Sequence, residues 1–370
     1  MITVSLCMIV KDEEDVIARC LDSVADLADE LIVVDTGSTD RTVEIVGRYT
    51  DRKYTFAWTD DFAAARNYAF EQAAMDYILW LDADDVLTEI NREKLRALKQ
   101  TLTDEVDSVT MLYELAEDDC GNVTFQLRRN RLVKRSRGFR WIGAVHEYLE
   151  VGGTIASSDI AVKHMGKPGK RDSERNIRIY ERRLAEGETL SPRDLYYYAN
   201  ELCDHGLHKK AITYYERFLN EGGGWIEDNI SACGRLADCH HVLGDMKSEL
   251  EASLRSLQFD APRAEFCCRI GYHFLSTSRY GEAVFWYALA TERKLPEGHL
   301  GFDNPACATW LPHLQLCVCY DKLGQHALAI LHNDLALQYR PTDAVMLANR
   351  DYFARRLSLS TPDDAAGRGA

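Results

Sequence analysis

The chain has 370 residues, and its 44 Lys and Arg against 59 Asp and Glu leave a formal charge of −15. This length predicts two or three domains, each with enough apolar residues to bury a core. The negative charge argues against a general nucleic-acid binder or a peripheral membrane protein, because both classes need a positive field. We therefore expect no nucleic-acid partner.

The sequence also predicts a cellular compartment. Its longest apolar stretch, residues 2–10, is far shorter than the roughly twenty residues that span a bilayer, so no membrane span is expected. Met1 leads directly into this stretch and acidic residues follow it, which is not the pattern of a signal peptide. The eleven cysteines form no C-x-x-C pair, which favours reduced thiols and a cytoplasmic protein.

Short apolar runs alternate with helical patterns over residues 1–159. The predicted strands are 3–10, 31–35, 54–58 and 77–81, and the predicted helices are 14–27, 40–49, 62–74 and 89–102. This order is typical of a mostly parallel, doubly wound α/β sheet. Beyond Asp107 the pattern indicates antiparallel strands, with a hairpin turn at 119–122.

Helical repeats are predicted from residue 191 onward. The small residues Ala199, Ala237, Gly271 and Cys317 occupy similar places and are separated by 38, 34 and 46 residues, near the tetratricopeptide period of about 34. Four stacked helical hairpins would bury one continuous core, and an ordinary helical bundle is the alternative. The predicted division is an α/β domain 1–165, a charged helical linker 166–190, helical repeats 191–357 and a disordered tail 358–370.

Carboxylates follow three predicted strands. They lie in Lys11-Asp12-Glu13-Glu14, in Asp35-Thr36-Gly37-Ser38-Thr39-Asp40 and in Asp82-Ala83-Asp84-Asp85. Ligands of open α/β sheets bind beyond the carboxyl ends of the strands. Such an acidic edge would repel itself without a positive charge, so Asp82 and Asp84 are candidate ligands of a hard divalent cation. The alternative is that these acids cap the next helix and solvate a turn.

Two enzyme classes share single motifs with this chain. Asp35-Thr36-Gly37-Ser38 has the letters of an aspartic protease loop, but that fold needs β-rich surroundings and a second such loop. Asp82-Ala83-Asp84-Asp85-Val86 resembles the nucleophile loop of haloacid-dehalogenase-type phosphatases. In those enzymes the loop follows the first strand, whereas here it follows the fourth, so the phosphatase stays only as an alternative.

Basic and titratable residues follow the acidic motifs. Residues 128–140 include seven Lys or Arg, which either neutralise a phosphate group or protect a solvated strand edge. Glu147, in the sequence His146-Glu147, is a candidate general base for an incoming hydroxyl or thiol. His164 is a further candidate, although a lone histidine is more often structural.

Taken together, the motif 35–40, the pairs Asp60-Asp61 and Arg66-Asn67, and the motif 82–85 resemble family 2 glycosyltransferases of the GT-A fold. The resemblance covers roughly residues 1–165. The His146-Glu147 motif and the helical repeats resemble a bacterial subgroup that joins this domain to tetratricopeptide repeats. Glycosyltransferases that modify the cysteine or serine of secreted antimicrobial peptides have a similar layout.

The resemblance implies an inverting enzyme that uses Mn²⁺ or Mg²⁺ and moves a hexose or N-acetylhexosamine from a UDP-sugar. It implies Glu147 and Arg66 as catalytic residues, and Asp82, Asp84 and His164 as metal ligands. The implied donor site contains Lys11, Glu13, Asp35, Gly37, Ser38, Asp61, Arg66, Asp82, Ala83 and Asp84.

Three hypotheses for the acceptor and the repeats stay open. A concave solenoid suits a protein or peptide acceptor. A cell-envelope glycan or lipid-linked acceptor is the second hypothesis, with repeats that serve only to form a homodimer. The third is a repeat scaffold without catalysis.

Overall fold

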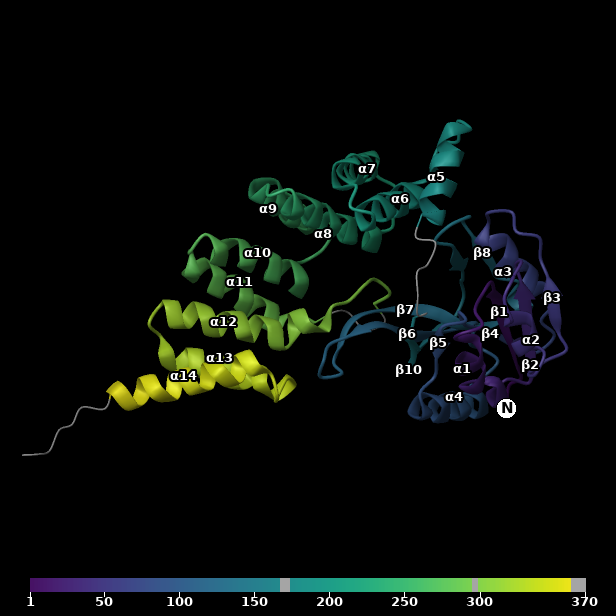
Figure 1. The fold of residues 1–370 in the computed structure, drawn as a ribbon, viewed down its shortest axis with the longest axis horizontal. Helices are drawn as coiled ribbons and strands as arrows, with labels where there is room; N and C mark the ends of the chain where they lie inside the picture. Colours follow the sequence, from purple (N-terminus) through teal and green to yellow (C-terminus); the bar gives the residue numbers. More distant parts are fainter. Residues whose placement is uncertain (167–173, 295–298, 361–370) are drawn as a thin grey trace, which may run out of the picture. The chain divides into compact units, whose positions relative to one another are not determined.

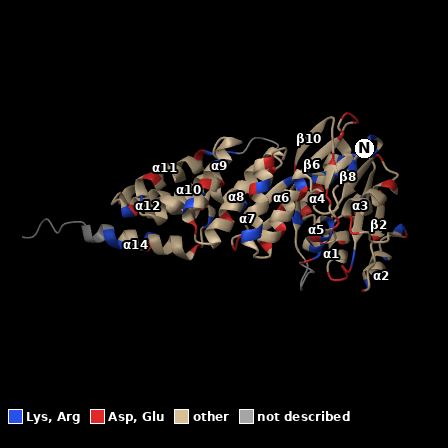
Figure 2. Ribbon diagram, turned by 90° about the horizontal axis from the view of Figure 1, so that it is seen from above, with Lys and Arg blue, Asp and Glu red and all other residues tan. Residues whose placement is uncertain are grey.

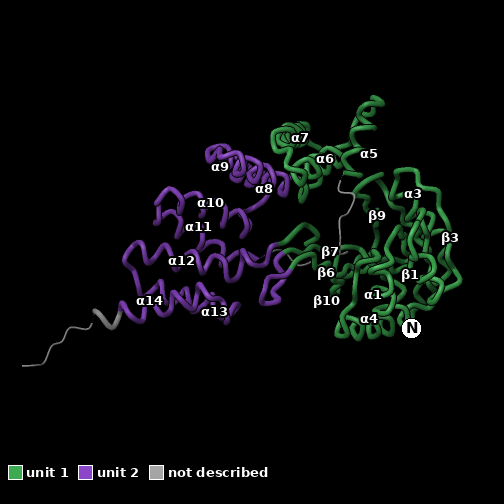
Figure 3. Tube along the Cα trace, viewed as in Figure 1, with its two compact units in different colours: residues 1–116, 125–228, 297–303 green, residues 117–124, 229–296, 304–370 purple. Residues whose placement is uncertain are grey.

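The computed structural model describes residues 1–166, 174–294 and 299–360 (Figure 1). The chain folds as two compact units (Figure 3). Unit 1 contains residues 1–116, 125–228 and 297–303, and unit 2 contains residues 117–124, 229–296 and 304–370. Within the described ranges, no helix combines the length and the apolar character that a membrane crossing requires.

An eight-stranded sheet forms the centre of unit 1, in the order β3-β2-β1-β4-β7-β6-β10-β5. The strands are β1 (Val4–Val10), β2 (Glu30–Asp35), β3 (Lys53–Thr55), β4 (Tyr77–Trp80), β5 (Asp85–Val86), β6 (Ser108–Glu117), β7 (Val123–Lys134) and β10 (Ile155–His164). β3, β2, β1 and β4 are parallel, while β7 pairs antiparallel with β4. The predicted α/β class is confirmed. Of the strands after Asp107, β7 pairs antiparallel with β4 and β10 with β5, as predicted, but β6 and β10 run parallel to each other.

The central strands are buried on both faces. β1, β2 and β4 are almost wholly apolar, as expected for parallel strands covered by helices. The covering helices are α1 (Ile17–Asp22), η1 (Ala25–Leu27), α2 (Thr42–Val46), α3 (Phe62–Glu71) and α4 (Glu89–Thr101). The predicted helix 14–27 is interrupted because Ser23 Oγ donates to the carbonyl of Cys20 (2.7 Å), a local bond that competes with helix continuation.

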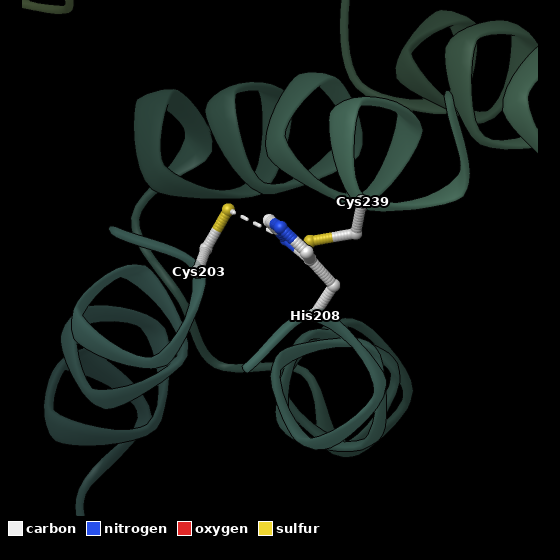
Figure 4. A group of neighbouring side chains, drawn as sticks. All are labelled: Cys203, His208 and Cys239. Carbon is white, nitrogen blue, oxygen red and sulfur yellow. Dashed lines mark hydrogen bonds between the residues drawn. The ribbon is translucent and has the colours of Figure 1, made fainter. Parts of the chain in front are cut away.

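Unit 1 also contains a short hairpin, β8 (Arg140–Ile142) with β9 (Tyr148–Glu150), and three helices. These are α5 (Arg175–Ala185), α6 (Pro192–Asp204) and α7 (His208–Glu221). α6 begins with a capping box of Ser191 and Asp194. Where α6 gives way to α7, Cys203 Sγ lies 3.9 Å from His208 Nδ1 (Figure 4). All eleven cysteines are free and ten are buried, in line with the predicted reduced thiols.

The helices from α8 onward form the repeats of unit 2. They are α8 (Ile226–Val242, whose first residues belong to unit 1), α9 (Met246–Arg255), η3 (Ser256–Gln258), α10 (Ala264–Ser276), α11 (Tyr280–Glu292), η4 (Pro305–Ala308), α12 (Trp310–Lys322), α13 (His326–Tyr339) and α14 (Ala344–Ser360). Figure 2 shows acidic and basic residues interleaved along these helices. The predicted helical solenoid is confirmed.

A residue with left-handed backbone connects the two helices of each repeat. Gly206, Gly244 and Gly324 have φ near 74°, and Ser278 takes the same place in the third repeat with φ of 60°. Ala199 and Ala237, two of the small residues that define the repeat spacing, are fully buried. Of the predicted disordered tail, residues 358–360 instead end α14, and 361–370 lie outside the described residues. Residues 167–173 of the predicted linker also lie outside them.

Candidate active site

The Asp-x-Asp motif forms a tight turn directly after β4. The amide of Asp82 donates to Oδ2 of Asp85 (3.0 Å), and the amide of Asp85 donates to the carbonyl of Asp82 (3.1 Å). Asp85 then begins β5, which pairs with the end of β10 and sets His164 opposite Asp85. Strand β10 therefore brings His164 to the Asp-x-Asp turn.

Three side chains converge at this turn. Asp84, Asp85 and His164 each offer one ligand atom, and these atoms lie within 4.8 Å of one another. His164 Nδ1 lies 3.4 Å from Asp84 Oδ1 and 3.1 Å from the hydroxyl of Tyr113. Hydrogen bonds with Asp84 and Asp85 raise the pKa of His164 to about 9, against the effect of burial. Two carboxylates and an imidazole fit a divalent cation such as Mn²⁺.

Asp82, the other expected metal ligand, pairs with Arg66. Asp82 Oδ1 accepts from Arg66 Nη2 (2.6 Å), and Glu147 Oε1 accepts from Arg66 Nε (2.5 Å). The Arg66 guanidinium lies 4.8 Å from the Trp141 ring and 5.2 Å from the Trp80 ring. Burial tends to raise the pKa of Asp82, but the charge of Arg66 outweighs it and holds that pKa below its usual range. The structure thus joins both candidate catalytic residues to the Asp-x-Asp turn.

This network changes the argument for a metal. A divalent cation would relieve the repulsion among the acids at this edge of the sheet. The structure supplies positive side chains from within the chain, because Arg66 pairs with Asp82 and the fully buried Arg131 pairs with Asp85 (3.0 Å). Support for a metal therefore rests on the convergence of Asp84, Asp85 and His164 rather than on charge repulsion.

Helix α3 fixes the segment that carries Glu147. Asn67 Nδ2 donates to the carbonyl of Trp141 (2.9 Å), and the amide of Trp141 donates to Asn67 Oδ1 (2.8 Å). The side-chain amide thus pairs with the edge of β8 as a neighbouring strand would. The amide of Phe62 donates to the carbonyl of Ala144 (2.9 Å). The Arg66-Asn67 pair therefore holds both Glu147 and the strand that leads to it.

The end of β2 folds into a compact turn around Asp35. Its carboxylate accepts from the amides of Gly37 and Ser38, each at 3.1 Å, and Gly37 has φ of 103°. This φ favours glycine, so the turn requires that residue. Carboxylate oxygens can each accept further hydrogen bonds, so these contacts leave Asp35 able to bind a ligand.

The end of β1 is tied to that turn. The amide of Asp12 donates to Ser38 Oγ (2.9 Å), and the amide of Glu13 donates to Thr42 Oγ1 (2.7 Å). Lys11 is exposed beside them. β2, β1 and β4 are neighbours in the sheet, so the three acidic strand ends form one rim, as the sequence analysis expected.

The Asp60-Asp61 pair organises the start of α3. Asp61 is the N-cap of the helix and accepts from the amide of Ala64 (2.9 Å). Asp60 accepts from Trp58 Nε1 (2.7 Å) and pairs with Arg182 of α5. The structure thus gives Asp61, predicted in the donor site, a capping contact.

Most of the basic run 128–140 is used within the fold. Its partners are the carbonyl of Ser158 for Arg128, Asp85 for Arg131, Asp104 for Lys134, the carbonyl of Met75 for Arg135, Asp107 for Arg137 and Glu71 for Arg140. Arg129 differs, because its side chain forms no hydrogen bond or ion pair with any of the described residues. Its guanidinium lies 5.5 Å from the Tyr113 ring and 5.9 Å from the Trp80 ring.

Sequence reasoning did not single out Arg129 or Arg131 and did not assign Asp85 as a metal ligand. A usable signal existed for the two arginines, because residues at i and i+2 of a strand share one face. Glu201 of α6, which contacts His146, carried no such signal because the contact links distant parts of the chain.

Comparisons with known proteins identify relatives of the domain that contains this site. Residues 5–152 match the model of the family Glycosyl transferase family 2, a range that includes Asp35, Asp84 and Glu147 and ends before His164. A TPR repeat-containing protein of Synechococcus elongatus is 40% identical over 150 residues, which are 40% of this chain and 36% of that protein.

Two further relatives are named glycosyltransferases. The SPbeta prophage-derived glycosyltransferase SunS of Bacillus subtilis is 28% identical over 229 residues, 59% of this chain and 53% of that protein. The lipopolysaccharide core biosynthesis glycosyltransferase LpsC of Rhizobium meliloti is 26% identical over 162 residues, 42% of this chain and 59% of that protein. The chain thus spans between about a third and three fifths of these relatives.

Proposed function

We propose that this chain, whose residues 5–152 match the model of glycosyl transferase family 2, transfers a hexose or N-acetylhexosamine from a UDP-sugar to a protein or peptide side chain, with inversion and with a bound Mn²⁺ or Mg²⁺. The observation that carries the proposal is the convergence of Asp84, Asp85 and His164 at the rim where β2 and β1 also end. The family match over residues 5–152 supports it independently.

Asp84, Asp85 and His164 would hold the ion, which when bound would offset negative charge on the leaving diphosphate. Asp35 would accept a hydrogen bond from the uracil, with Gly37, Ser38, Lys11 and Glu13 around the base and ribose. Ala83 would contribute the backbone of the Asp-x-Asp turn. Asp82, which pairs with Arg66, would aid Asp84 at the ion, and Asp61 would hold the start of α3.

Proton transfer is assigned to Glu147. The acceptor hydroxyl or thiol gives its proton to this carboxylate while its oxygen or sulfur bonds to the anomeric carbon from the face opposite UDP. The anomeric carbon–oxygen bond breaks and its electron pair leaves with UDP, which inverts the anomeric centre. Arg66 orients the Glu147 carboxylate for this step through the 2.5 Å hydrogen bond.

The acceptor class rests on the helical repeats, because stacked hairpins present a long surface suited to an extended chain. A glycan or lipid-linked acceptor is the competing proposal. Incubation of the protein with radiolabelled UDP-glucose and a bacterial lysate separates them. Label in the protein fraction supports a peptide acceptor, and label in the solvent-extracted lipid or the polysaccharide fraction supports the alternative.

Calorimetric titration with UDP in the presence of Mn²⁺ tests the donor site. We expect binding that is lost in Asp84→Ala and unchanged in Asp51→Ala, which alters an exposed carboxylate away from the rim. A panel of UDP-sugars, assayed for hydrolysis with and without Mn²⁺, then identifies the donor. Binding of UDP that is indifferent to both Mn²⁺ and Asp84→Ala would contradict the proposal.

A further inference from the structure

His146, the residue before the proposed base, has a backbone conformation that its own sequence does not favour. Its φ of 52° lies in the left-handed region, which is uncommon for a residue other than glycine. Such a conformation persists only where surrounding contacts impose it. Several contacts of His146 come from α6, a helix of the same unit that lies outside the sheet.

Three residues of α6 contact His146. Glu201 Oε1 lies 2.6 Å from His146 Nε2, Tyr197 stacks on the imidazole with ring centroids 4.4 Å apart, and Arg193 Nη2 donates to the His146 carbonyl (3.0 Å). These residues are four positions apart, so they form one face of the helix. Tyr197 thus contacts the imidazole ring of His146, Glu201 its Nε2 atom and Arg193 its backbone carbonyl.

The same face reaches past Glu147. The Arg193 guanidinium lies 4.7 Å from the ring of Tyr148, the residue after the proposed base, and 4.6 Å from that of Tyr197. Glu201 is itself held, because Asn176 Nδ2 of α5 donates to it (2.7 Å). Both neighbours of Glu147 are therefore fixed by α6, while Glu147 itself is fixed by Arg66.

We propose that α6 is a positioning element of the active site, in which Glu201, Tyr197 and Arg193 hold His146 in the left-handed conformation that directs Glu147 toward Arg66. The proposal rests on the proposed function, because it assigns Glu147 a part in the reaction. Glu201 touches no reacting atom and acts through His146. The first helical pair, α6 and α7, therefore belongs to the catalytic unit, and its α6 positions active-site residues.

The test compares full-length Glu201→Ala and Glu201→Gln with a matched control, Glu181→Gln. Glu181 lies on the neighbouring α5 and pairs with Lys210 (2.9 Å). Hydrogen exchange of peptides that cover 143–150 reports the conformation of the segment without any need for activity. We expect at least fivefold faster exchange there in Glu201→Ala, an intermediate effect in Glu201→Gln, which keeps an acceptor oxygen, and none in Glu181→Gln.

Hydrolysis of UDP-glucose and UDP-N-acetylglucosamine with Mn²⁺ supplies the second readout. In Glu201→Ala, kcat per folded molecule should fall at least tenfold, while KM and the affinity for UDP change less than twofold. Glu201→Gln should recover part of the lost kcat. A purely stabilising role would lower Tm but leave kcat and KM of the folded enzyme unchanged.

The outcomes separate this inference from the proposed function. Unchanged exchange over 143–150 in Glu201→Ala would overturn the inference whatever the activity. Faster exchange with unchanged kcat would overturn it as well. If the wild-type protein bound no UDP and hydrolysed neither sugar nucleotide, the proposed function would fail, and the exchange data would still decide whether α6 holds the segment.

Discussion

Buried carboxylates at the rim of the sheet are paired with cations, whereas two buried titratable groups in the helical repeats of unit 2 stay neutral. At the rim, Asp82 and Asp85 are kept beside guanidinium groups of Arg66 and Arg131. In the repeats, burial raises the pKa of the Tyr287 hydroxyl and lowers the pKa of His332 to about 4, so both stay neutral near pH 7. The rim therefore carries paired charges, whereas Tyr287 and His332 contribute neutral packing.

The largest effect is expected where the rim is broken at its centre. Arg66→Ala leaves Asp82 and Glu147 without their common partner, and removal of one member of a buried ion pair costs about 3–5 kcal/mol. We expect a lower Tm of unit 1 and about a hundredfold loss of UDP-sugar hydrolysis, because the proposed base loses its orientation. Calorimetric unfolding and steady-state hydrolysis measure the two effects.

Arg48→Ala is the matched control for that variant. Arg48 pairs with Glu44 on the exposed surface of α2, and such pairs are worth about 0.5 kcal/mol or less. Its Tm and activity should equal those of the wild type. Full hydrolysis in Arg66→Ala would show that Glu147 needs no partner for its role.

The repeats and the rim differ in how far they could be predicted from the sequence. The spacing of Ala199, Ala237, Gly271 and Cys317 predicted the repeats, because helix packing depends on residues close in the sequence. The acids of the rim were also predicted, since strand ends gather at one edge. Their partners were not, because pairs such as Arg66 with Glu147 join residues far apart in the sequence. The turn at Ser278 escaped prediction because serine rarely adopts positive φ.

The second effect tests the close packing of α10 against α11 in the repeats. A Cβ at Gly271 would lie 3.0 Å from the buried ring of Tyr287, so Gly271→Val forces α10 and α11 apart. We expect a loss of about 2–3 kcal/mol in the stability of unit 2, as for other overpacked cores. Denaturant unfolding followed by circular dichroism measures it.

Gly281→Val, on α11, is the control, because a Cβ there meets no atom within 4 Å. It should leave stability within about 0.5 kcal/mol of the wild type. UDP binding should survive in both variants, since the rim belongs to unit 1. Equal stability of the two variants would contradict a close-packed α10–α11 contact.

The third effect concerns a buried carboxyl of unit 1 whose charge is only partly compensated. Burial raises the pKa of Asp228 to about 6, and Arg193, 3.7 Å away, opposes this only in part. Because the folded pKa exceeds the unfolded one, Asp228 costs stability once the pH rises through about 4 to 6. We expect Asp228→Asn to be more stable than the wild type by about 2 kcal/mol at pH 7.5.

That gain should shrink as the pH falls toward 4, where the folded wild-type carboxyl is protonated and the unfolded one about half protonated. Thermal unfolding of both proteins from pH 4 to 8 measures the difference, and Asp51→Asn is the exposed control. A gain that does not vary with pH would assign the effect to packing rather than to charge.

The smallest effect tests the role of the Arg129 charge at the rim. Arg129 stacks near Trp80 and Tyr113 and pairs with none of the described carboxylates, although acids surround the Asp-x-Asp turn. We interpret this guanidinium as a contact for the donor diphosphate. Arg129→Met keeps an apolar side chain against the rings and removes the charge, so UDP should bind about tenfold more weakly, or about 1.4 kcal/mol.

Uridine distinguishes a phosphate contact from a general disturbance of the rim, because it carries the base and ribose without a diphosphate. Its affinity should be equal in the wild type and in Arg129→Met. Arg128→Met is the matched control, since Arg128 is the adjacent residue of β7 and donates to the carbonyl of Ser158 (2.7 Å). Equal weakening of UDP and uridine by Arg129→Met would mean that Arg129 shapes the site rather than binds phosphate.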